Sequence, residues 1–170
     1  NSIKLLKKTI QLSPNHVDAY NNLGNVYIEL NNLEKALFYY QKAIIINPKY
    51  VESHYNIGNI FYKSGKYNEA VVCFKKVIKI NPKYAEAYNN LGVVFKQLNN
   101  LDEAVVCYQE ALKINSRYEQ VYTNLGNISN EKGNCKEAIT YFQKANKIKP
   151  DYLTSHWLSL NTFPIVYINT

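Results

Sequence analysis

The sequence predicts an all-α protein in which pairs of amphipathic helices recur along the chain. Residues 17–50, 51–84, 85–118 and 119–152 align without a gap, which gives a period of 34 residues. Each period contains two stretches whose apolar residues recur at helical spacing. Residues typical of helix ends stand at fixed places between these stretches, so each period is expected to fold as two helices.

The first helix of each repeat is predicted from the first half of the period. We number the positions of each repeat from 1 to 34, so that position 1 of the first full copy is Val17. Positions 4, 7, 8 and 11 recur at helical spacing, and position 8 is always glycine. Position 15 holds Asn or Gly, which tolerate the left-handed conformation that ends a helix. The first helices should therefore end at Asn31, Gly65, Asn99 and Gly133.

The second helix follows from positions 20, 24 and 27, where alanine, an aromatic residue and a small apolar residue recur. Small residues at positions 8 and 20 fit a close approach of the paired helices, with the aromatic residue filling the remaining gaps. Asn47–Pro48, Asn81–Pro82 and Lys149–Pro150 should end these helices. Ser116 replaces the proline in the third copy and Ser129 replaces the position-11 aromatic in the fourth, so looser packing is expected around the fourth repeat.

The two flanks extend the pattern. Within residues 1–16, residues 2–14 are expected to form the second helix of a truncated preceding repeat. Residues 153–170 begin with the first helix of a following unit, which should stop at Pro164. This last segment is apolar around Trp157, so we expect it to fold back, to meet a further domain or to pair with another copy. With no methionine in the chain, a segment cut from a longer protein is the favoured interpretation.

The eight recurring positions resemble the signature of the tetratricopeptide repeat (TPR) family. Examples are the Leu23–Gly24 pair, Ala36 and Pro48 of the first full copy. The resemblance implies a right-handed superhelix, or α-solenoid, of antiparallel helix pairs. It also implies that the first helices line the concave surface and that the second helices lie on the convex surface.

Composition argues against nucleic acid as the partner. The chain has 20 Lys and Arg against 13 Asp and Glu, a net charge of +7, but Arg117 is its one arginine. Proteins that read bases rely on arginine, and the 24 asparagines indicate AT-rich coding bias. Positions 26, 29 and 33 form a basic stripe, interpreted as a solvated outer face or, alternatively, as a site for an anionic partner or membrane surface. The stripe consists of Lys42, Lys49, Lys76, Lys79, Lys83, Lys113, Arg117, Lys144 and Lys147.

No catalytic, metal or cofactor site is predicted. His54 and His156 occupy position 4, where other copies carry tyrosine, and Cys73 and Cys107 occupy position 23, so all four are interpreted as packing residues. The chain has three cysteines without a pairing framework, which indicates a reducing cytoplasmic or nuclear location. No apolar run reaches the ~18 residues of a membrane span.

The sharpest functional signal is a column of asparagines on the expected concave face. Positions 2, 6, 9 and 13 share one face of the first helix, with position 5 beside them. Because a carboxamide both donates and accepts hydrogen bonds, such a column suits the backbone of an extended peptide. The alternative is that asparagine is merely abundant and bonds locally. The predicted peptide-binding residues are Asn22, Asn56, Asn90 and Asn124 at position 6, Asn25, Asn59 and Asn127 at position 9, Asn21 and Asn89 at position 5, and Glu52 and Glu86 at position 2.

Two TPR subfamilies help to define this function. TPR domains that clamp chaperone tails use cations where this chain has Asn21, Glu86 and Asn90, so that role is disfavoured. The stretch AEAYNNLGVVF, residues 85–95, is similar to the arm of nucleocytoplasmic protein O-glycosyltransferases of the O-GlcNAc and SPINDLY type. That resemblance implies asparagines that hold a substrate polypeptide.

The predicted function is therefore a non-enzymatic scaffold that binds a protein or peptide. One alternative is the substrate-recognition arm of such a glycosyltransferase, whose sugar-nucleotide domain is absent from this sequence. Another is self-association as a homodimer through the apolar C-terminal segment.

Overall fold

The computed structural model describes residues 2–150, and every helix or strand element in that range is an α-helix. The chain divides into two compact units, of which unit 1 runs to Ile114 and unit 2 begins at Asn115. The helix predicted over residues 153–163 lies outside the described residues, so the proposed role of the segment around Trp157 stays a prediction. None of the described helices has the length and apolar character needed to cross a membrane.

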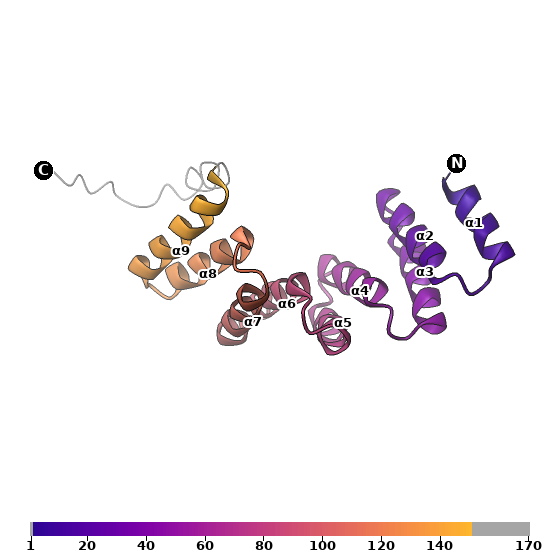
Figure 1. The fold of residues 1–170 in the computed structure, drawn as a ribbon. Coiled ribbons are helices and arrows are strands. Elements are labelled where there is room, and N and C mark those ends of the chain that lie inside the picture. Colours follow the sequence, from indigo (N-terminus) through magenta and orange to yellow (C-terminus); the bar gives the residue numbers. More distant parts are fainter. Residues whose placement is uncertain (1, 151–170) are drawn as a thin grey trace, which may run out of the picture. The chain divides into compact units, whose positions relative to one another are not determined.

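Helix pairs form the fold of each unit (Figure 1). A first and a second helix join through a short turn, and in unit 1 each second helix also contacts the first helix that follows it. In Figure 1, α4 and α6 lie side by side with α5 and α7 below them. Unit 1 contains α1 (Ser2–Leu12), α2 (Val17–Glu29), α3 (Leu33–Ile46), α4 (Val51–Lys63), α5 (Tyr67–Ile80), α6 (Ala85–Gln97) and α7 (Leu101–Ile114). Unit 2 contains α8 (Glu119–Glu131) and α9 (Cys135–Ile148).

The turns within the pairs form where the sequence predicts them. Asn31, Gly65, Asn99 and Gly133 all have positive φ angles, of 54°, 71°, 60° and 78°. Glycine meets no Cβ penalty in this region, and asparagine is one of the few other residues that visit it. In the first of these turns the next residue also caps the following helix, because the Asn32 Oδ1 accepts a hydrogen bond from the Lys35 backbone N–H at 3.0 Å.

Three of the second helices, α3, α5 and α7, are followed by an asparagine whose side chain folds over the turn. The Oδ1 atoms of Asn47 and Asn81 accept the backbone N–H groups of Lys49 and Lys83, at 3.0 and 3.1 Å. Asn115 does the same with Arg117 at 3.1 Å although Ser116 stands in place of proline. This side-chain turn is therefore built by asparagine and does not require the proline.

Within each pair a glycine of the first helix lies under an aromatic ring of the second. A Cβ built on Gly92 would lie 2.6 Å from Tyr108 Cε1, and the same contact recurs between Gly58 and Phe74 at 2.8 Å. Both rings are fully buried. The glycine at position 8 thus allows the two helices to approach closely, as the sequence predicts.

Candidate peptide-binding face

The predicted asparagines of unit 1 lie on its first helices, α2, α4 and α6, at different depths. Asn22 and Asn25 are exposed and Asn56 is half-buried, whereas Asn21 and Asn89 are buried. A buried carboxamide needs hydrogen-bond partners to offset its lost hydration. The partners that these asparagines have therefore determine what remains available to a ligand.

Between α2 and α4, the amide of Asn56 donates to two side chains of the preceding repeat. Its Nδ2 lies 3.2 Å from Asn25 Oδ1 and 3.3 Å from Asn21 Oδ1. The Tyr40 hydroxyl also donates to Asn25 Oδ1, at 2.7 Å, and the buried Ser53 hydroxyl donates to Asn21 Oδ1 at 3.1 Å. This network joins adjacent repeats through asparagine oxygens.

The same arrangement recurs between α4 and α6. Asn90 Nδ2 donates to Asn59 Oδ1 and to the Tyr55 hydroxyl, both at 2.9 Å. The oxygen of Asn90 is occupied as well, because it accepts from Asn89 Nδ2 at 3.1 Å. Position 6 of one repeat is thus bonded to positions 5 and 9 of the repeat before it.

These bonds divide the asparagines by role. Each position-6 Nδ2 of Asn56 and Asn90 carries two hydrogens and makes two bonds, so it has no donor left for a ligand. At Asn25 only the oxygen is engaged within residues 2–150, which leaves both amide hydrogens for a ligand. At Asn59 the oxygen accepts from Asn90 and the amide also donates to the Tyr55 hydroxyl, which leaves one amide hydrogen. The oxygen and nitrogen of each carboxamide are assigned from this network.

Two adjoining hollows open between the first helices at these side chains. A cavity of about 270 Å³ lies between α2 and α4, and one of about 180 Å³ lies between α4 and α6. Asn59 and Lys63 line both, so the two hollows adjoin each other. The first is lined chiefly by Asn25, Ile28, Tyr40 and Asn56, and the second by Tyr62, Asn90 and Val93. We call this surface, with its two hollows, the asparagine face.

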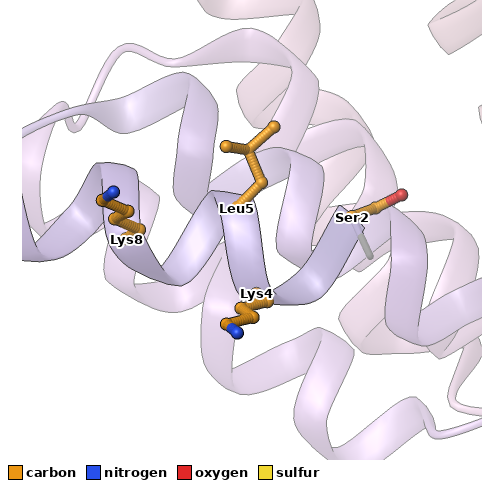
Figure 2. Close-up of a pocket in the computed structure, with 4 residues that line it drawn as sticks. All are labelled: Ser2, Lys4, Leu5 and Lys8. Atoms are coloured by element: carbon orange, nitrogen blue, oxygen red, sulfur yellow. The ribbon is translucent and has the colours of Figure 1, made fainter.

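A larger hollow of about 470 Å³ lies elsewhere, on the surface of α1 (Figure 2). Its lining residues, Ser2, Lys4, Leu5 and Lys8, all come from this one helix and are all exposed. Figure 2 shows them leaving the helix in different directions, so no set of polar groups converges on the hollow. A peptide site needs such convergent groups, and the asparagine face provides them.

The remaining predicted site residues lie in two places. Glu52 and Glu86 are exposed in the first turns of α4 and α6. Asn124 and Asn127 are half-buried on α8, in unit 2. The continuous column over all four copies stays a prediction. In the same unit the Ser129 hydroxyl is buried and donates to Glu137 Oε2 at 2.9 Å, which satisfies the serine that replaces an aromatic residue.

Sequence patterns alone do not reveal the tyrosines of the asparagine face. Tyr40 occupies position 24, whose role in the sequence is packing, and Tyr55 occupies position 5, where Asn21 and Asn89 stand in other copies. The one available signal is that position 24 alternates between Tyr and Phe, since a tyrosine hydroxyl at a buried position needs a partner. Burial raises the pKa of Tyr40 to about 12, so its hydroxyl remains a donor at neutral pH.

Among the described residues, His16 and His54 make hydrogen bonds to or from the backbone, and burial shields Cys73 and Cys107. Nδ1 of His16 accepts the Ala19 backbone N–H at 3.2 Å and caps α2, and His54 Nε2 lies 2.9 Å from the Pro48 carbonyl, to which it donates. No group of three or more His, Cys, Asp or Glu suited to a metal ion occurs within residues 2–150. Burial raises the pKa of both the Cys73 and the Cys107 thiol to about 11, which makes them poor nucleophiles.

We expect the three thiols to react at two very different rates. Cys135 is exposed, whereas Cys107 is buried and Cys73 half-buried. A pKa near 11 leaves about a thousandth of each of the latter two thiols ionised at pH 8, so they should react at least about a hundredfold more slowly than Cys135. Ellman's reagent should show one fast thiol in the native protein and three in denaturant. A fast phase that survives Cys135→Ser would contradict this assignment.

Comparison with known proteins agrees with the repeat geometry. Three family models described as tetratricopeptide repeats match residues 5–38, 85–118 and 119–152, and one described as a TPR repeat matches 24–65 and 58–99. The chain belongs to the tetratricopeptide repeat family. A search of curated proteins found no match.

Among solved structures, this TPR protein is similar to MamA. One crystal structure of MamA has 26% sequence identity and a TM-score of 0.78, over 87% of this chain and 86% of that chain. A second has 25% identity and a TM-score of 0.75, over 95% and 87%. MamA 41-end from Desulfovibrio magneticus RS-1 has 20% identity and a TM-score of 0.78, over 88% and 85%.

These findings confirm the all-α TPR fold class and with it a protein-interaction scaffold, the general role of TPR repeats. The more specific likeness to the arm of the O-glycosyltransferases stays a prediction from the sequence.

Proposed function

We propose that the asparagine face of unit 1 binds an extended segment of a partner protein. The observation that carries this proposal is the pair of adjoining hollows lined by Asn25 and Asn59, which keep amide hydrogens available for a ligand. Both residues are at position 9, so they recur once per repeat along the same face. Asn56 and Asn90, two of the asparagines that the sequence singles out at position 6, join adjacent repeats at this surface.

The chemistry of the face suits a peptide backbone. Each Nδ2 of Asn25 and Asn59 can donate to a main-chain carbonyl of the ligand, and such bonds are independent of the ligand's side chains. Ile28, Tyr62 and Val93 add apolar walls for a side chain that points into a hollow.

The double variant Asn25→Ala/Asn59→Ala should weaken peptide binding by about thirtyfold, since each of the two lost hydrogen bonds contributes roughly 1 kcal/mol. It should remain folded, because Asn56 and Asn90 keep Asn21 Oδ1 and the Tyr55 hydroxyl as acceptors. Linear peptides selected from a random library against the wild-type chain would serve as probes. Their affinities would be measured by titration calorimetry, with circular dichroism to check the fold.

Asn68→Ala/Asn146→Ala is the matched control, because both side chains are exposed on second helices and neither lines a hollow. It should bind the selected peptides as the wild type does. Unchanged affinity in the Asn25→Ala/Asn59→Ala variant, or a library that gives no binder, would count against the asparagine face as the site.

The glycosyltransferase alternative is a narrower form of the same proposal. In that family the asparagines hold the substrate polypeptide, and the unbroken position-6 column supports the likeness. It predicts that peptides selected on the asparagine face contain serine or threonine more often than the starting library does. Self-association through the segment around Trp157 predicts a dimer that is lost when the chain is truncated before Leu153.

A further inference from the structure

The second helices of unit 1 expose apolar side chains at recurring positions. Positions 22, 26 and 29 step by four and three residues and therefore share one side of the helix. We call this side of α3, α5 and α7, together with position 33 in the turns after α3 and α5, the outer face. Its apolar residues are between 51% and 72% exposed: Phe38, Ile45, Val72 and Val106. Single exposed apolar residues are common, but here position 22 is apolar and exposed on three successive second helices.

Lysines surround these apolar side chains. The outer face carries six exposed lysines: Lys42, Lys49, Lys76, Lys79, Lys83 and Lys113. Its one carboxylate, Glu110, is paired with Lys113 at 2.6 Å, which leaves a net charge of +5 on the face. Glu34 and Asp102 lie one turn before position 22, so the positive charge increases towards the C-terminal ends of the helices.

Helix α1 continues this composition at the other end of unit 1. Lys4 and Lys8 occupy the positions equivalent to 22 and 26, and Leu5 and Leu12 are 67% and 78% exposed. The hollow in Figure 2 is therefore lined by one apolar side chain, Leu5, and by two lysines, Lys4 and Lys8. Cationic groups beside exposed apolar carbon again characterise the surface.

We propose that the outer face of unit 1 docks on an anionic lipid membrane surface. Lysines near an anionic leaflet are attracted to its headgroups, and partly inserted apolar side chains gain from leaving water. Lysine suits this diffuse attraction because its flexible chain can extend along the interface. In line with this, Lys42 Nζ lies 5.5 Å above the centre of the Phe38 ring, with its charge at the surface.

A nucleic acid is the alternative polyanion, and the outer face fits it less well. Unit 1 contains no arginine, because Arg117 lies in unit 2, so the side chain that binds phosphate in a bidentate manner is missing from the outer face. A polynucleotide would also leave Phe38 and Val72 in water, whereas a membrane interface accepts them. The contribution of the apolar residues to binding therefore distinguishes the two partners.

The test is sedimentation of the full chain with vesicles of phosphatidylcholine, with and without phosphatidylserine. Binding should require phosphatidylserine and should fall as salt is raised. Lys76→Gln/Lys79→Gln should weaken it by about twentyfold, since each lysine near such a surface contributes roughly fivefold. Lys63→Gln/Lys66→Gln removes the same charge from exposed residues outside the outer face and should bind as the wild type does.

Val72→Ser/Val106→Ser tests the apolar contribution and is harmless to the core because both side chains are exposed. It should weaken vesicle binding about fivefold while leaving the affinity for a single-stranded oligonucleotide unchanged. The proposal is overturned if the two lysine pairs behave alike, or if the valine variant binds vesicles as the wild type does. Asn25→Ala/Asn59→Ala should bind vesicles normally, which keeps this test independent of peptide binding.

Discussion

Gly92→Ala is expected to lower the free energy of unfolding by about 2 kcal/mol, although alanine is the better helix former. The gain in helix propensity is about 1 kcal/mol. Against it stands a methyl group placed 2.6 Å from Cε1 and 2.8 Å from Cδ1 of Tyr108. Tyr108 is fully buried, so its ring cannot move aside without displacing α7 from α6. Overpacking of this kind costs about 1–3 kcal/mol or more, and urea denaturation would measure the balance.

The control for this prediction removes the ring edge. Tyr108→Leu destabilises by itself, because it leaves space in the core of the α6–α7 pair. In the double variant Gly92→Ala/Tyr108→Leu the new methyl group should occupy part of that space. The combined loss should therefore be at least 1 kcal/mol smaller than the sum of the two single losses. If the two losses in the free energy of unfolding simply add, the contact with the Tyr108 ring is not the reason that position 8 needs glycine.

Local sequence signals predicted the helices and their ends well. Asn31 and Gly65 indicate where the first helices stop because few residues adopt positive φ without strain. Position 8 indicates the close approach because only glycine leaves room for the ring above it. Each of these features depends on residues within one helix pair, and the same residues recur in the next copy.

The hydrogen bonds of the asparagine face could not be predicted in the same way. A carboxamide at position 6 can point to a ligand, to water or to a neighbouring repeat, and the sequence does not distinguish these directions. In the structure, the amides of Asn56 and Asn90 donate to side chains of the preceding repeat, and amide hydrogens of Asn25 and Asn59 remain available to a ligand. The division into units at Ile114 and Asn115 is likewise not predicted by the repeat pattern, which continues through it; the nearest departure is Ser116.

This division of roles suggests why position 6 is asparagine in the second and third full copies. One side chain must donate to two acceptors on the preceding first helix while it remains at a surface open to ligands. Aspartate cannot donate when ionised, and alanine would leave the acceptors in the junction without their donor. The requirement at position 9 is different from that at position 6. Val93 occupies position 9 in the third full copy, so a repeat can do without an amide there.

Asn90→Ala is accordingly expected to destabilise unit 1 by about 2 kcal/mol. The variant loses the bonds from Nδ2 to the Tyr55 hydroxyl and to Asn59 Oδ1, and it removes the oxygen that accepts from Asn89. Asn89 is buried, so its amide cannot exchange that partner fully for water. Each net hydrogen bond contributes about 0.5–1.5 kcal/mol, and buried groups left without partners raise the cost. Urea denaturation followed by circular dichroism would measure the loss.

Asn22→Ala is the matched control, since Asn22 occupies position 6 of the first full repeat. Its side chain is exposed and has no hydrogen bond within residues 2–150, because the helix before it, α1, is a second helix and offers no position 5 or 9. The change should alter stability by no more than about 0.5 kcal/mol. If Asn22→Ala and Asn90→Ala lower the free energy of unfolding by the same amount, the position-6 side chains do not join the repeats. Ligand binding alone must then explain the asparagines at this position.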